Sequence, residues 1–123
     1  MFREKINEFI KVISETEDSK CLDMMEELIE SASDYMRRVN VLEIGVMVGK
    51  YSKEGDEYRE YIQKLDKQRS SAHNSLILNV KVINRLCRNH DLPLIYEGNE
   101  DDRVEVSEFA QKVVDELFST RRL

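Results

Sequence analysis

The sequence contains few residues that interrupt helices. One proline and four glycines occur in 123 residues, and these two residue types disfavour a helix interior most strongly. Hydrophobic residues make up 41% of the chain and charged residues 36%, proportions that provide a core and leave solvated helix faces. We therefore expect an all-α protein, and the length fits a single helical domain spanning residues 1–123.

Other absences exclude whole classes of protein. The most apolar stretch, residues 39–48, contains two polar residues and a glycine, so no run approaches the roughly 18 apolar residues of a membrane span. The first ten residues mix both charge signs, unlike a secretory signal peptide. Two cysteines, Cys21 and Cys87, are too few for a disulfide framework. We expect a cytoplasmic protein with reduced thiols and with no membrane partner, metal or other cofactor.

Acidic residues outnumber basic ones. The 25 Asp and Glu residues against 19 Lys and Arg residues give a net charge of −6, which repels nucleic-acid phosphates and anionic lipids. No basic stripe accompanies the tyrosines, so they are expected to pack on helix faces rather than to stack on bases. The sequence therefore predicts no nucleic-acid partner.

Apolar residues recur at spacings of three and four along most of the chain, which is typical of amphipathic helices. The buried stripe of the second helix is expected to run from Leu22 to Met47. Asp102 is the expected N-cap of the last helix, and Glu105 completes a variant of the capping box. We expect an antiparallel helical bundle of about four helices with two long central helices, over residues 2–15, 19–52, about 56–89 and from 102 onward.

Four local features refine this outline. Gly55 is expected to take the left-handed conformation that reverses the chain. Residues 69–74 contain few good helix formers, so the third helix is expected to bend there or to divide into two packed segments. Gly45 and Gly49 are expected to accommodate a bulky neighbour. The apolar loop at residues 90–99 is expected to seal the end of the bundle, the alternative being that it meets a partner.

Polar residues within the apolar stripes are the candidate site residues: Glu43 on the second helix, and Arg69, His73 and Asn84 on the third. Similar distances from the turn bring Glu43 to the level of Arg69 in an antiparallel hairpin. One interpretation is a buried ion pair that fixes the register of the helices. The other is a pocket for a small polar or anionic ligand, in which arginine holds a carboxylate beside a histidine. A third possibility is that the assumed helix phase is wrong.

Three arginines outside the buried stripes, Arg85, Arg88 and Arg103, are further candidates for contacts with an anion. The alternative is that they belong to an ordinary solvated face. No catalytic residue and no metal ligand is assigned, because neither His73 nor His90 has a glutamate three residues before it, as a di-iron bundle requires. These tests favour a protein that is not an enzyme.

Two enzyme families share short segments with this chain. The segment DLPLIY at residues 91–96, followed by Asp102 and Arg103, resembles part of the all-helical chorismate mutases, whose basic side chains hold a dicarboxylate. The final helix of that fold has no counterpart here. The acidic cluster at residues 26–30 resembles the first magnesium-binding cluster of the all-α nucleotide pyrophosphohydrolases, but the second cluster is missing.

A third resemblance covers roughly the C-terminal half. The segment SAHN at residues 71–74, the segment PLIYEG at 93–98 and the helix from Asp102 to Phe118 resemble a small family of uncharacterised bacterial all-α proteins. The resemblance implies a helical fold and an absence of assigned activity, so no functional residues are carried over from it.

We expect a helical module for protein interaction or regulation that associates with itself as a homodimer and can bind another protein. The two long central helices motivate this expectation, because the shorter helices would leave some of their apolar turns exposed. The alternative is a helical domain that binds a small polar or anionic ligand, or an enzyme of one of the two families above, with Arg69, His73 and Glu43 in its site.

Overall fold

The structure is a computed structural model that describes residues 2–52 and 55–118. Within these residues it contains four α-helices and one short 3-10 helix and no strand, so the all-α prediction is confirmed. The elements are α1 Phe2–Ser14, η1 Glu17–Cys21, α2 Asp23–Ser52, α3 Gly55–Asn89 and α4 Arg103–Phe118.

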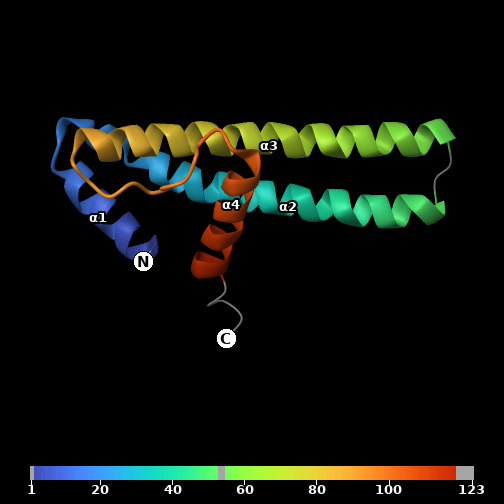
Figure 1. Cartoon of the computed structure of the whole chain (residues 1–123), viewed down its shortest axis with the longest axis horizontal. Coiled ribbons are helices and arrows are strands. Elements are labelled where there is room, and N and C mark those ends of the chain that lie inside the picture. Colours follow the sequence, from blue (N-terminus) through green and yellow to red (C-terminus); the bar gives the residue numbers. More distant parts are fainter. Residues whose placement is uncertain (1, 53–54, 119–123) are drawn as a thin grey trace.

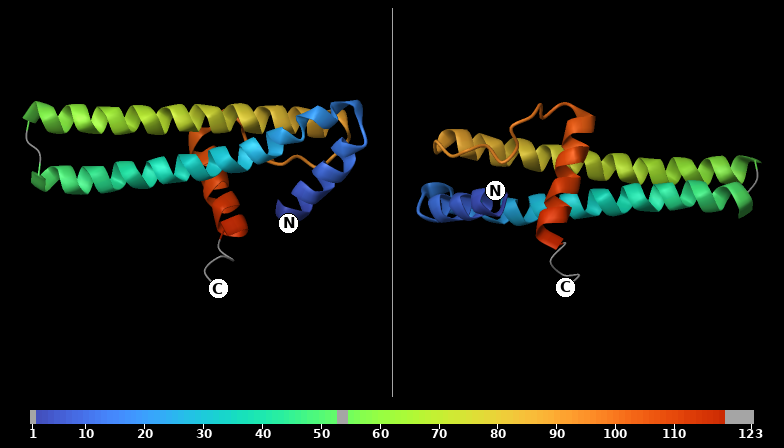
Figure 2. Two further views of the ribbon diagram at one scale, coloured as in Figure 1. Left: turned by 180° about the vertical axis from the view of Figure 1, so that it is seen from behind. Right: turned by 60° about the horizontal axis from the view of Figure 1, so that its bottom comes forward.

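The long helices α2 and α3 form an antiparallel hairpin, which determines the elongated shape of the molecule (Figure 1). α1 lies at the end of the hairpin away from its turn, and α4 crosses the hairpin near its middle (Figures 1 and 2). The part of the hairpin nearer the turn is covered by neither helix, and we call residues 38–52 and 55–68 the distal hairpin. Gly55 has a φ of 58°, which confirms its predicted left-handed conformation.

The core lies in the other half of the hairpin, where α1, α4 and the loop after α3 pack onto α2 and α3. The first helix faces this core through Phe2, Ile6, Phe9 and Ile13. Ile10, which the sequence predicts in the same apolar stripe, is 43% exposed. The largest fully buried apolar side chains come from all four α-helices: Phe9, Ile13, Leu28, Leu76, Val80, Ile83, Val106 and Val113.

α2 begins later than residue 19, where the sequence predicted its start. The chain first forms η1, whose N-cap Thr16 accepts a hydrogen bond from the backbone N–H of Asp18 at 3.1 Å. Buried side chains on α2 then recur at alternating spacings of three and four: Met25, Leu28, Ala32 and Tyr35. This period of about 3.5 residues is typical of two helices that pack along each other.

Gly45 and Gly49 continue this seam into the distal hairpin, and both are buried. A Cβ atom on Gly45 would collide with Leu65, and one on Gly49 would lie 2.5 Å from Cε2 of Tyr58. Only glycine leaves room for these side chains of α3 at so close an approach. The prediction that the two glycines accommodate bulky neighbours is confirmed.

α3 is continuous through residues 69–74, so the predicted division into two segments is wrong. The helix is also straight in the three views of the ribbon (Figures 1 and 2). Ala72, His73 and Leu76 are buried in this region. Their packing against neighbouring helices outweighs the weak helix propensity of the sequence.

α3 ends in a Schellman motif. The backbone N–H of Leu92 donates to the carbonyl of Cys87 at 2.8 Å, and that of Asp91 donates to the carbonyl of Arg88 at 3.4 Å. Asp91 has a φ of 54°, the left-handed conformation that this motif requires and that glycine usually supplies.

The loop that follows α3, residues 90–102, seals the core as predicted, and we call it the sealing loop. Ile95 and Tyr96 are only 3% and 8% exposed. The side chain of Asn84, itself fully buried, accepts from the backbone N–H of Ile95 at 3.0 Å and donates to the carbonyl of Tyr96 at 2.9 Å. Asn84 is therefore a core residue that holds this loop.

Asp102 caps α4 by accepting from the backbone N–H groups of Val104 and Glu105 at 3.0 and 3.1 Å. The predicted return bond from Glu105 to Asp102 is wrong. The Glu105 carboxylate accepts instead from the backbone N–H of Asn99 at 2.9 Å and from the hydroxyl of Tyr96 at 3.1 Å. The Glu105 carboxylate binds the loop rather than Asp102 because the loop folds back over the first turn of the helix.

Candidate functional site

Arg69, His73 and Arg103, three of the residues singled out in the sequence, line one cavity of about 400 Å³. It lies where the first turns of α4 cross α2 and α3. Its lining residues are Tyr35, Met36, Arg69, His73, Arg103, Val104, Ser107, Glu108 and Gln111. We call it the arginine cavity.

A hydrogen-bond network holds the three helices together at this cavity. The hydroxyl of Ser107 donates to the carbonyl of Arg103 at 2.7 Å. Because Ser107 has only one hydroxyl proton, the hydroxyl of Tyr35, 2.7 Å away, must donate to Ser107. The network fixes the start of α4, and with it the position from which the Arg103 side chain extends.

His73 joins the same network from α3. Its Nε2 lies 3.3 Å from the carbonyl of Arg103, and a carbonyl can only accept, so Nε2 carries the proton. Burial lowers the pKa of His73, as do the positive charges of Arg103 and Arg69. The ring is therefore neutral, and its buried Nδ1 is an acceptor that has no hydrogen-bond partner among the described residues.

The sequence placed Glu43 in the core, and this placement is wrong. Glu43 is exposed, and Arg69 pairs with Asp66 of its own helix at 2.9 Å. The error came from extrapolating a period of 3.6 residues from Met25 to Glu43. A helix packed along another follows a period near 3.5 residues, and the difference amounts to about 20° per heptad.

The other predicted site residues lie away from the arginine cavity. Asn84 holds the loop, as described above. Arg85 is exposed on α3. Arg88 pairs with Glu100 at 3.0 Å. The structure therefore brings together three of the seven candidates, and these three favour the pocket interpretation over the buried ion pair.

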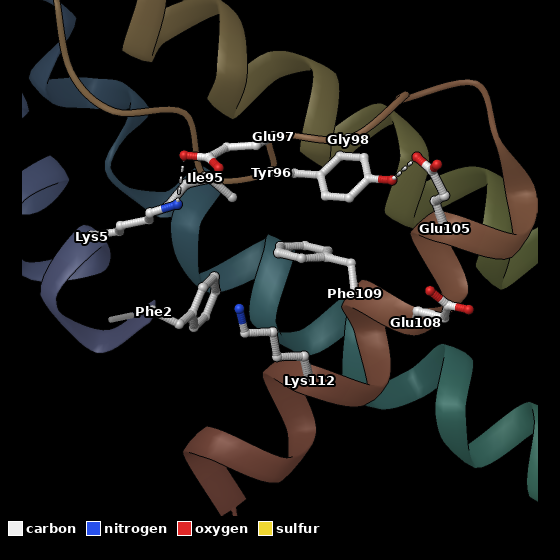
Figure 3. A pocket seen from close by; sticks show the side chains of 10 residues that line it. All are labelled: Phe2, Lys5, Ile95, Tyr96, Glu97, Gly98, Glu105, Glu108, Phe109 and Lys112. Atoms are coloured by element: carbon white, nitrogen blue, oxygen red, sulfur yellow. Dashed lines mark hydrogen bonds and ion pairs between the residues drawn. The ribbon is translucent and has the colours of Figure 1, made fainter.

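A larger cavity of about 600 Å³ lies between α1, α4 and the sealing loop (Figure 3). Its walls are aromatic, with Phe2 and Tyr96 on either side of Phe109 and ring centroids 5.7 and 5.0 Å from that of Phe109. The charged groups around it are mixed: Lys5, Lys112, Glu97, Glu105 and Glu108. Sequence analysis missed this cavity because its residues come from three separate segments.

Tyr96 is the most perturbed group of this larger cavity. Burial and the hydrogen bond to Glu105 raise the pKa of Tyr96 to about 12, so the phenol stays protonated and donates to the carboxylate (Figure 3). Lys5 lies 3.5 Å from the Glu97 carboxylate across the mouth of the cavity. These contacts tie the loop to α1 and α4, and the mixture of charges favours no single class of ligand.

The distal hairpin carries an exposed apolar surface on α2. Ile44 is 59% exposed, Met47 66% and Val48 55%, and Val41 is 37% exposed beside them. We call these four residues the outer α2 face. The sequence expected Met47 to be buried, and that expectation is wrong. The signal that could have found the face is the presence of apolar residues on every side of the helix between residues 41 and 48.

The described residues contain no membrane-spanning helix and no metal-binding cluster. None of their helices has the length and hydropathy needed to cross a lipid bilayer, and their His, Cys, Asp and Glu side chains form no group of three suited to a metal ion. Cys21 and Cys87 are both free, and burial raises the pKa of the Cys87 thiol.

Over residues 2–123 the chain matches a family described as "Protein of unknown function (DUF3232)". The chain belongs to this family. The match covers nearly all of the sequence, whereas the resemblance found in the sequence covered about half of it. No curated protein and no solved structure matches the chain. Membership therefore confirms a family of unknown function, and any function has to be argued from the surfaces described above.

Proposed function

We propose that this protein is a cytoplasmic interaction module that forms a homodimer through the outer α2 face. The observation that carries the proposal is the cluster of four exposed apolar side chains within eight residues of α2. Contiguous apolar patches of more than a few hundred Å² are uncommon on monomers and mark interaction surfaces. A two-helix hairpin also has no second layer of its own to cover this face.

Charge favours a second copy as the occupant. The distal hairpin contains five Lys and Arg residues and five Asp and Glu residues, whereas the rest of the chain contains 14 and 20. The net negative charge of the protein therefore lies outside the distal hairpin. Two copies that meet there experience little of the repulsion that a charge of −6 would otherwise produce.

The sequence of the face is also compatible with two-fold symmetry. An axis between residues 44 and 45 of two antiparallel α2 helices places Val41 of each copy opposite Val48 of the other. The same axis places Glu43 opposite Val46, and no like charges of α2 are paired. The face is short, so the interface should lie near the lower end of stable interfaces, about 1,200 Å² in total, with reversible association in the micromolar range.

Sedimentation velocity over low to high micromolar concentrations tests the proposal. The wild type should shift from 14.5 kDa toward twice that mass as concentration rises, and Met47→Glu should remain a monomer because each copy would bury an unpaired charge at the interface. Leu78→Glu is the matched control, since Leu78 is 65% exposed on α3, far from the face. It should dimerise like the wild type.

Three results would contradict the proposal. The first is a wild type that remains monomeric at every concentration. The second is a Met47→Glu variant that dimerises normally while its circular dichroism shows a folded protein. The third is dissociation by Leu78→Glu, which would move the interface to the part of α3 around Leu78.

A further inference from the structure

The arginine cavity lies away from the outer α2 face, and one chain is sufficient to build it. It presents two guanidinium groups, from Arg69 on α3 and Arg103 on α4. The Arg69 guanidinium keeps free N–H donors beyond its contact with Asp66, because the group has five. The Arg103 side chain makes no hydrogen bond or ion pair within the described part of the chain. Arginine pairs of this kind recognise planar anions, which they bind through two parallel hydrogen bonds.

The other residues that line the arginine cavity limit the kind of anion that it can bind. Met36, Val104 and the ring of Tyr35 form an apolar wall, which suits an apolar substituent on the ligand. Glu108 also lines the cavity, and its negative charge disfavours a dianion such as phosphate. A single carboxylate attached to a short apolar group satisfies both constraints, and a volume of about 400 Å³ accommodates it.

We infer that the arginine cavity binds a small monocarboxylate with an apolar substituent, held by Arg69 and Arg103. Gln111 adds an amide donor at the edge of the cavity. His73 lines the same cavity, and its buried Nδ1 has no hydrogen-bond partner among the described residues. The carboxylate would offset the positive charge of the two guanidinium groups where they face the imidazole.

Binding should therefore be coupled to the protonation of His73. The charged and titratable groups that line the cavity with His73 are Tyr35 from α2, Arg69 from α3, and Arg103 and Glu108 from α4. The two arginines contribute to the lowered pKa of His73. A bound carboxylate opposes their effect, so it should raise the pKa of His73, and affinity should increase as the pH falls toward that pKa.

Nuclear magnetic resonance of the two histidines gives a direct test, because His90 serves as an internal control. His90 lies at the end of α3, where its Nε2 is 2.7 Å from the carboxylate of Asp18. Titration with phenylacetate at pH 7 should move the ring resonances of His73 to saturation and leave those of His90 in place. Phenethylamine has the same ring with the opposite charge and should produce no saturable shift.

Arg103→Gln should weaken phenylacetate binding by about tenfold or more, since it removes one charged partner of the carboxylate. Arg85→Gln is the matched control, because Arg85 is an exposed arginine outside the cavity, and it should bind like the wild type. Repeating the titration with Met47→Glu keeps the result independent of self-association. A pH titration of His73 with and without phenylacetate should show the higher pKa in its presence.

The inference is overturned if phenylacetate moves neither histidine, or if it moves both to the same extent. Equal affinity of the wild type and Arg103→Gln would also overturn it. Inorganic phosphate that binds as tightly as phenylacetate would show an unselective anion site and would reject the monocarboxylate class.

Discussion

His73 and Asn84 lie on the same helix and connect different segments of the chain to it. Asn84 binds the backbone of the sealing loop, and His73 binds the first residue of α4 through the Arg103 carbonyl. Sequence analysis identified both residues because each interrupts an apolar stripe of α3. It could not distinguish their roles, since the partners lie in a loop and a helix whose positions depend on the complete fold.

The neutral state of His73 predicts a pH dependence of stability. Its pKa is lowered in the folded protein by burial and by two arginines, so the unfolded chain binds a proton more readily. The free energy of unfolding should therefore fall as the pH decreases through the ordinary histidine pKa of 6.5. Urea unfolding at a series of pH values measures this.

His73→Gln provides the comparison for that experiment. Glutamine keeps a donor that can reach the Arg103 carbonyl and does not titrate, so the variant should lose the part of the pH dependence that arises near neutrality. An identical pH profile in the variant and the wild type would show that His73 is not the responsible group.

Asp91 offers a second prediction for a single residue. A non-glycine residue in the left-handed region is under steric strain, and at a helix C-terminus glycine relieves that strain. Asp91→Gly should therefore increase the free energy of unfolding by up to about 1 kcal/mol. The exposed Asp91 side chain contributes little that would be lost. A lower urea midpoint for Asp91→Gly would contradict the assignment of strain at this residue.

The helices were predictable as elements to different degrees. The stripe of α1 and the ends of α3 agree with the sequence, because strong apolar periodicity and a left-handed glycine mark them. The sequence did not predict which residues of α2 are buried in the distal hairpin. This part of α2 packs against α3 alone, so its buried sector is narrow. The continuity of α3 through residues 69–74 depends on tertiary packing that the local sequence does not encode.

The sealing loop is the element whose role is tested most simply. Ile95 of this loop is only 3% exposed. Ile95→Asp therefore places an unpaired charge in the core and should lower the free energy of unfolding by about 3 kcal/mol. Val104→Asp, at a position 68% exposed in the first turn of α4, is the control and should change it by about 0.5 kcal/mol or less. If urea unfolding gave similar midpoints for the two variants, the loop would not be part of the core.

At the scale of the whole molecule, one half is packed in three dimensions and the other half is a bare hairpin. α1, α4 and the sealing loop all pack on the half of the hairpin away from its turn (Figure 1). The distal hairpin is held by close packing of glycines against tyrosines and Leu65. A fold that concentrates its core at one end and exposes apolar side chains at the other is suited to assembly with a second copy.

The candidate site was only partly predictable at this scale. The chemistry of a pocket with Arg69 and His73 was visible in the sequence, because both residues lie on the buried side of one helix. The contribution of Arg103 depends on α4 crossing the hairpin at the level of His73, which helical periodicity does not determine. The outer α2 face was missed for the related reason that its exposure depends on how far α4 covers α2.

Disulfide trapping at the outer α2 face tests the central claim most directly. Ile44→Cys, oxidised gently at micromolar concentration, should yield a covalent dimer of twice 14.5 kDa on a non-reducing gel, because the proposed two-fold axis passes beside this residue and brings its two copies together. Leu78→Cys, similarly exposed but on α3 outside the distal hairpin, and the wild type with its two native cysteines should remain monomeric. An Ile44→Cys protein that stays monomeric, or that cross-links no faster than Leu78→Cys, would contradict the account.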